Sequence, residues 1–186
     1  MHPSLKLPAA QDLLGMIVQL VNDTLRAAAL DDMAAFALWV PNDPESYAEP
    51  EAVSACSSSA WSATVAKLSG RPSSTEIGIV LDPQAWDHPD LPVGPPPDPQ
   101  RFEEASRQFL ESVDLSLEPV QALLNEAARR VALAPPIPTP GLLVAMATDG
   151  QHSDDTLANV RYASSERTRA ELRRLGLLPA RFGDQQ

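Results

Sequence analysis

The chain has 186 residues, of which 44% are apolar and 21% are charged, and its formal net charge is −11. This length and composition indicate a single globular domain that buries roughly 70% of the surface of its unfolded chain. The longest clean apolar run, Met33–Val40, is far shorter than the ~20 residues of a membrane helix. We therefore expect a chain without a membrane span.

The acidic charge is spread unevenly along the sequence. Residues 1–60 carry a net charge of −6 and residues 61–128 carry −7, whereas residues 129–186 carry +2. Acidic surfaces repel phosphates, which argues against nucleic acid or an anionic membrane as a partner. The same field attracts a basic protein. The alternative is that the acidic residues only keep the chain in solution.

Cys56 is the only cysteine, so the chain cannot form an intrachain disulfide. The first residues lack the apolar segment of a secretory signal, and together these features predict a cytoplasmic protein. Cys56 would be a candidate nucleophile if a histidine lay beside it. The alternative is a small buried apolar side chain.

The first third of the chain alternates helix and strand patterns. Residues 1–8 are expected to form a flexible lead, followed by a helix over residues 9–30 whose apolar side chains repeat at helical spacing. Two strands are predicted over residues 33–40 and 53–57. A helix over residues 59–67 would follow, with Ser59 as its N-cap and Gly70 after its end.

A third strand is predicted over Thr75–Leu81, because Ile77, Ile79 and Leu81 alternate with other residues. Residues 82–99 contain seven prolines and are expected to form an ordered loop. Helices over residues 100–113 and 116–132 come next, and the proline-rich residues 134–140 indicate an internal connector rather than a domain boundary.

The last third begins with a buried apolar strand over residues 141–148. Two helices are expected over residues 154–162 and 165–175, with Arg167 and Glu171 spaced for an ion pair, before a flexible tail at 179–186. Residues 1–186 thus form one α+β domain, in which helices pack on a small, mainly antiparallel sheet of about four strands.

The most site-like residues are Trp86, Asp87, His88 and Asp90, which fall within five positions directly after the third predicted strand. We predict that they bind a partner. Trp86 would act either as an exposed platform for a basic partner or as a buried cover over the end of the sheet. No catalytic residue, metal or cofactor is predicted, and the chain has no phosphate-binding loop or dinucleotide motif.

An enzyme is the rival hypothesis. Asp87 and His88, together with His152 and Asp154, offer imidazole and carboxylate groups that suit a divalent metal and hydrolysis. Their spacing matches no specific metal motif. Two imidazoles more than about 8 Å apart could not share one ion.

The order of these elements resembles an uncharacterised bacterial family, domain-of-unknown-function 4303. The resemblance rests on the FALWV strand, on a strand running into Pro83-Gln84-Ala85-Trp86, and on a helix that begins near Phe102. It spans residues 10–178. The chain departs from the family in having Val80-Leu81 where an aromatic residue is expected, and a proline-rich insert after Trp86.

The family brings no established activity, so the functional expectation comes from charge and fold. Small acidic α+β proteins include toxin-neutralising immunity proteins, which is a likeness of general architecture only. We expect a non-enzymatic bacterial protein-binding module of the immunity or regulatory type. The alternatives are a metal-assisted hydrolase and a structural homodimer that pairs an exposed apolar strand with its twin.

Overall fold

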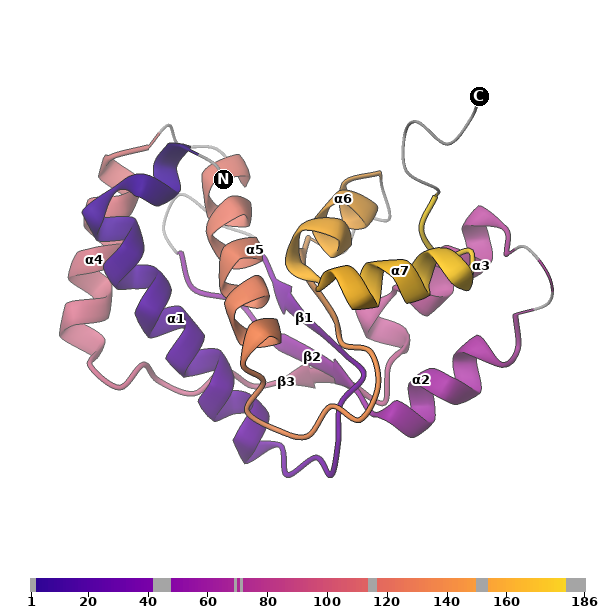
Figure 1. Cartoon of the computed structure of the whole chain (residues 1–186). Coiled ribbons are helices and arrows are strands. Elements are labelled where there is room, and N and C mark those ends of the chain that lie inside the picture. The colour runs from indigo at the N-terminus through magenta and orange to yellow at the C-terminus, as the bar shows by residue number, and fades with distance from the viewer. Residues whose placement is uncertain are drawn as a thin grey trace.

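The computed structural model describes residues 3–41, 48–68, 70, 72–113, 117–149 and 154–179. Its centre is a four-stranded sheet in the order β3-β2-β1-β4 (Figure 1). The strands are β1 (Ala35–Trp39), β2 (Val53–Cys56), β3 (His88–Leu91) and β4 (Val144–Thr148). The predicted α+β class and the number of strands are therefore confirmed.

The sheet is mixed, which corrects the expectation of a mainly antiparallel one. Strands β1 and β2 pair antiparallel, as do β2 and β3, but β4 runs parallel to β1. A parallel pair needs a long connection that returns the chain to the same end of the sheet. Here β2, β3, four α-helices and one 3-10 helix lie between β1 and β4 among the described residues.

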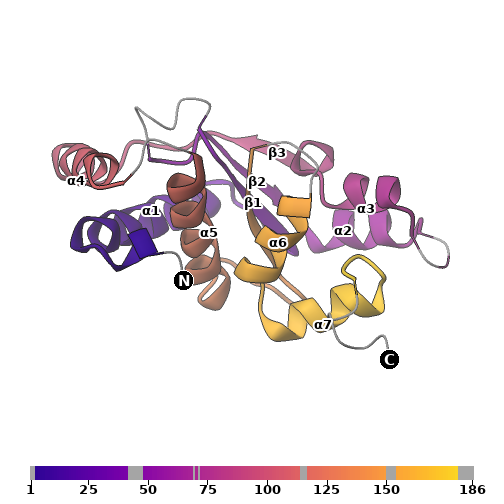
Figure 2. The same ribbon diagram turned by 90° about the horizontal axis from the view of Figure 1, so that it is seen from above.

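Helices cover both faces of the sheet, as Figures 1 and 2 show. One face carries α1 (Pro8–Ala27), α4 (Pro99–Glu111) and α5 (Leu117–Leu133). The other face carries α2 (Ser58–Val65), α3 (Ser74–Val80) and α7 (Glu166–Arg174). Helix α6 (Asp154–Ala163) lies beside the edge strand β4.

The sequence of the central strands explains this three-layer arrangement. In β1, Phe36 and Leu38 belong to the apolar core beneath α1 and α5, whereas Ala35 and Ala37 belong to the core on the opposite face. A strand with both faces buried is apolar at every position, without the alternation of a half-exposed strand. The predicted strands over residues 33–40 and 141–148 show this pattern, and both are confirmed.

Side chains complete the hydrogen bonding of the outer edge of β4. Three alternate backbone N–H groups along this edge donate to side-chain oxygens, and the Nδ2 group of Asn159 donates to the carbonyl of Ala147 at 3.0 Å. The acceptors are Thr168 Oγ1 for Leu143 (3.3 Å), Ser164 Oγ for Ala145 (3.1 Å) and Asn125 Oδ1 for Ala147 (3.0 Å).

The predicted strand over Thr75–Leu81 is wrong, because these residues form helix α3. The side-chain hydroxyl of Ser73 accepts from the backbone N–H of Glu76 at 3.3 Å, and the Glu76 carboxylate accepts from the N–H of Ser73 at 2.8 Å. This reciprocal capping box stabilises the first turn of a helix. Ile79 is 54% exposed, although a strand would have placed it on one face with Ile77 and Leu81.

The proline-rich loop predicted over residues 82–99 contains two regular elements. A 3-10 helix, η2, spans Pro83–Ala85, and strand β3 spans His88–Leu91. Pro89 lacks an N–H group, which a strand tolerates only at a sheet edge or a bulge. Strand β3 is an edge strand, and its register with β2 is irregular at this place.

The N-terminal lead also differs from expectation. Residues Pro3–Lys6 form a 3-10 helix, η1, and Leu5 is buried in the core beneath α1 and α5 rather than being part of a flexible lead. Residues 134–143 connect α5 to β4, and the carbonyl of Pro138 accepts a hydrogen bond from Met33 N–H. Most of the expected tail, residues 180–186, lies outside the described residues.

Candidate functional site

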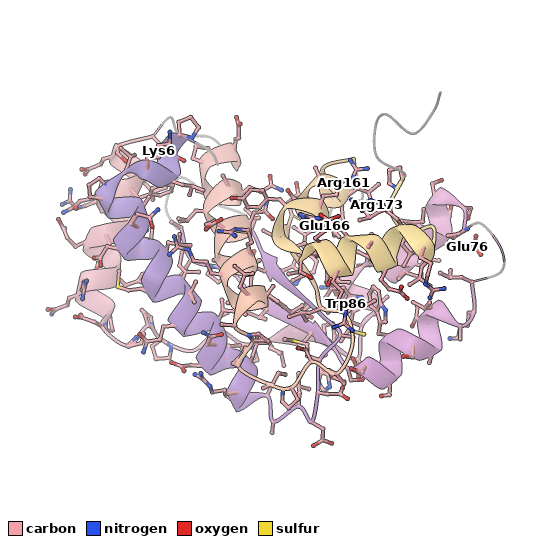
Figure 3. The ribbon with its side chains drawn as sticks, in the orientation of Figure 1. Lys6, Glu76, Trp86, Arg161, Glu166 and Arg173 are labelled. Carbon is pink, nitrogen blue, oxygen red and sulfur yellow. The ribbon has the colours of Figure 1, made fainter. Side chains whose placement is uncertain are left out.

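Trp86 is a buried anchor. Its side chain is 7% exposed, packs in the same core as Leu172 of α7, and donates its indole N–H to the carbonyl of Val80 at 3.1 Å. Figure 3 labels Trp86 within the body of the molecule and Glu76 at its periphery. Of the two predicted roles, the structure supports the buried cover, and Trp86 itself offers no exposed platform.

Asp87 joins the turn after η2 to the N-terminus of α2. Its carboxylate accepts hydrogen bonds from the backbone N–H of Ser57 at 3.0 Å and from the Ser57 hydroxyl at 2.5 Å. Ser57, not the predicted Ser59, is the N-cap of α2. Burial alone would raise the pKa of Asp87, but the bonds from Ser57 and the neighbouring His88 lower it below its ordinary value.

A second carboxylate binds at the same helix end. Asp32 accepts the backbone N–H of Ser58 at 2.8 Å. The first N–H groups of a helix lack partners within it and carry partial positive charge, so carboxylates are favourable there. Asp32 and Asp87 therefore hold α2 in place from two distant parts of the chain.

The remaining predicted site residues lie on the surface. His88 is half-exposed, and its Nε2 lies 3.7 Å from the Asp87 carboxylate. Asp90 is exposed and accepts the side-chain amide of Gln84 at 3.2 Å. The structure thus brings Asp87 and His88 together, whereas the Trp86 side chain is directed into the core.

Cys56 does not fit the role of nucleophile. Its side chain is 2% exposed, and burial together with the charge of Asp87 raises the pKa of the thiol to about 12. A thiol with such a pKa is almost entirely protonated at neutral pH. The alternative, a small buried apolar side chain, describes Cys56 better.

The metal-assisted hydrolase hypothesis depends on residues that the structure does not describe. His152 lies outside the described residues, so its separation from His88 stays a prediction. Within the ranges that are described, no group of three or more His, Cys, Asp and Glu side chains is placed to hold a metal ion. Metal analysis of the purified protein is the direct test of this hypothesis.

The clearest feature of the charge distribution is a pair of long segments that contain no basic residue. Residues 27–66 and 72–100 contain eleven Asp or Glu and no Lys or Arg, and these segments supply β1, β2, β3, α2 and α3. We call the acidic side chains in the segment before β2 and in residues 82–91, which contain η2 and β3, the acidic edge. Its members are Glu49, Glu51, Asp82, Asp87 and Asp90, all exposed or half-buried.

Two hydrogen bonds tie the edge strand to the sheet. The Ser54 hydroxyl of β2 donates to the carbonyl of Pro89, and Trp39 Nε1 donates to the same Ser54 oxygen at 2.7 Å. Burial raises the pKa of Glu49 at the far end of the acidic edge. The acidic edge therefore combines carboxylates of different proton affinity, Glu49 with a raised pKa and Asp87 with a lowered one.

The fold and the surface define an α+β protein with a mixed sheet and an acidic edge. No family model matches the chain, and no match is found among the curated proteins or the solved structures. The resemblance to domain-of-unknown-function 4303 therefore stays a prediction, and the element that runs into Pro83–Trp86 is helix α3. Among the described residues, the helices are all too short or too polar to cross a membrane.

Proposed function

We propose that this protein is a non-enzymatic protein-binding module of the immunity or regulatory type, which binds a basic partner through the acidic edge. The observation that carries the proposal is the absence of Lys and Arg from residues 27–66 and 72–100, the two segments that contain all five carboxylates of the acidic edge. Like-signed charge on one surface steers an oppositely charged partner and speeds its association.

The construction of the acidic edge supports this role. Asp87 is held at a helix N-terminus by Ser57 and has a lowered pKa, so it stays charged at neutral pH. The buried Trp86 fixes the backbone next to it. A surface that is rigid before binding loses less conformational entropy on binding.

The partner would contact side chains rather than extend the sheet. Strand β3 has only four residues, and it includes Pro89, which offers no N–H group, and the charged Asp90. Short edge strands with proline and charge resist the addition of another strand. A cytoplasmic location is part of the same proposal, because the single cysteine is buried and has no partner for a disulfide.

A pull-down from the native host at low salt tests the proposal. The wild-type chain should retain a basic protein, and the retained amount should fall as salt rises, because salt screens exposed charges beyond about 10 Å at 0.1 M. Light scattering on the purified chain distinguishes such a partner from a second copy of this chain.

A matched pair of double variants sharpens the experiment. Glu51→Lys with Asp90→Lys reverses two charges of the acidic edge, and Glu103→Lys with Glu111→Lys makes the same change in net charge on the exposed face of α4. The first variant should lose the partner and the second should retain it. The proposal is wrong if both variants lose the partner equally, or if the wild type retains none at low salt.

A further inference from the structure

A groove lies between α2 and α7. Its volume is about 1020 Å³, and residues 140–142 and Ala34 complete its wall. Cavities that hold small organic ligands usually have roughly 300–1,000 Å³. The groove is therefore large enough for a drug-sized molecule.

The groove is lined by one face of each helix. Helix α2 contributes Trp61 and Val65, spaced four residues apart, and α7 contributes Arg167, Glu171 and Arg174, spaced four and three apart. Residues at these spacings share a helix face. The apolar part of the lining also includes Leu142 of the connecting segment.

Arg167 is a cation without a partner. Among the described residues it makes no hydrogen bond or ion pair, although its spacing from Glu171 predicts a pair. Glu171 instead binds Arg174 through two hydrogen bonds, at 2.8 and 2.6 Å. Glu166, which Figure 3 labels on the same helix, binds Arg169 at 2.7 Å and Arg173 at 3.3 Å.

Trp61 carries a polar group without a partner. Its side chain is 5% exposed, yet its indole N–H makes no hydrogen bond within the part of the chain that is described. The other two tryptophans both donate, Trp39 to the Ser54 hydroxyl and Trp86 to a backbone carbonyl. The Trp61 indole nitrogen is not among the fully buried polar atoms that lack a partner, so it is open to solvent and a ligand in the groove can reach it.

We propose that the groove binds a small amphipathic anion whose carboxylate or phosphate group pairs with Arg167 and whose apolar body covers Val65 and Leu142. Arginine suits such a head group because its planar guanidinium makes two parallel hydrogen bonds to carboxylate or phosphate. The apolar body of the ligand contacts the Trp61 ring, or an oxygen on the ligand accepts a hydrogen bond from its indole N–H. A protein with a net charge of −11 thus keeps an uncompensated cation at one concave site.

An NMR titration of the full chain with three probes tests this proposal. Decanoate and decyl phosphate carry the same apolar chain with the two candidate head groups, and decanol carries it without charge. Both anions, or one of them, should shift the indole N–H signal of Trp61 and the backbone signals of the groove at millimolar concentration or below. Decanol should bind at least about tenfold more weakly, since it cannot accept a charge-assisted hydrogen bond from Arg167 as an anion does.

The variant Arg167→Gln should lose about tenfold or more in affinity for the anion that binds. The control is Arg161→Gln on α6, which removes a side-chain charge that likewise makes no ion pair in the described residues but does not line the groove. Figure 3 labels Arg161 near the α6–α7 junction. Arg161→Gln should bind as the wild type does.

The design separates loss of binding from loss of folding. If Arg167→Gln perturbs signals throughout the chain, Arg167→Lys retains the charge without the planar fork and should bind with intermediate affinity. The proposal is overturned if neither anion shifts the Trp61 signal, if decanol binds as tightly as the anions, or if Arg167→Gln binds unchanged. The acidic edge plays no part in any of these outcomes.

Discussion

Replacing Glu126 by glutamine should destabilise the folded chain at neutral pH and have little effect near pH 2. The Glu126 side chain, in α5, is 1% exposed. Its carboxylate accepts hydrogen bonds from Arg129 at 2.8 and 2.7 Å, from Arg130 at 3.1 Å and from the Tyr162 hydroxyl at 2.8 Å. Burial alone would raise the pKa of this carboxyl, but these bonds lower it to about 2.

The magnitude follows from this pKa. A fall from 4.5 to about 2 corresponds to at most about 3 kcal/mol of stability at neutral pH, at 1.36 kcal/mol for each pKa unit. Arg129 and Arg130 are 37% and 35% exposed, and solvent screening of these partners reduces the expected loss to about 2 kcal/mol. For a chain of this length, that loss lowers the melting temperature by about 4–8 °C.

The sign of the pH dependence is fixed by the same shift. Because the pKa of Glu126 is lower in the folded chain, the unfolded chain binds the proton more readily. The stabilisation is complete above pH 4.5 and is lost as the pH falls toward about 2. Urea unfolding of the wild type and of Glu126→Gln at several pH values measures the difference directly.

Glu104→Gln is the matched control for this experiment. Glu104 also pairs with an arginine three residues away, Arg107, at 2.6 Å, but both side chains are 52% exposed. An exposed pair of this kind should contribute well under about 1 kcal/mol. The reasoning is refuted if Glu126→Gln costs no more than Glu104→Gln at pH 7, or if its cost persists unchanged at pH 2.

Three other substitutions and one labelling reaction test the architecture. Trp86→Phe should cost about 1–3 kcal/mol in thermal unfolding, because it removes a buried hydrogen bond; an unchanged melting temperature would contradict the buried anchor. Cys56 should resist a thiol reagent at pH 8 until urea unfolds the chain, and rapid labelling of the folded chain would contradict its burial. Gly176→Ala should destabilise the fold, because the backbone φ at this position is +74° and the new Cβ would lie 2.8 Å from the Pro72 side chain. Gly78→Ala in α3 places its Cβ in open space and should stabilise the fold by about 0.5–1 kcal/mol. Equal effects of the two substitutions on the melting temperature would refute both predictions.

The spacing of apolar residues along the sequence is sufficient to predict the long helices and the central strands. In α1, which falls within the helix predicted over residues 9–30, Leu13, Ile17, Val21 and Leu25 lie at helical spacing and are fully buried, whereas Ala28 at the end of the same stripe is half-buried. Such positions carry a strong signal because many apolar side chains repeat with one period. The strands that are buried on both faces of the sheet are predicted equally well, because nearly all of their residues are apolar.

The errors lie where short segments depend on distant or competing contacts. Residues 74–80 fit a strand by alternation, and only the Ser73–Glu76 capping pair, which the sequence does contain, indicates a helix. Strand β3 forms because it pairs with β2, more than thirty residues earlier in the chain, and no local pattern reveals that pairing. The same holds for Asp87 and Ser57, whose contact spans 30 positions.

The candidate site was predicted only in part. The acidic character of the surface and the nearness of Asp87 to His88 follow from sequence alone. The inward direction of Trp86 does not, because the same aromatic residue in a turn can serve burial or recognition. The unpaired Arg167 was also unpredictable, since Glu171 had two arginines at suitable helical spacing and binds only the later one.

The hydroxyl and amide groups along β4 affect how readily the folded chain aggregates on storage. Thr168, Ser164 and Asn125 occupy the hydrogen-bonding positions that a strand from another molecule would need, and the opposite edge contains Pro89. Neither end of this sheet can serve as a template for cross-β growth. We expect the folded chain to remain free of aggregates on storage at moderate concentration, and the Ser164→Ala variant, which frees the N–H of Ala145, to form aggregates more readily in light scattering.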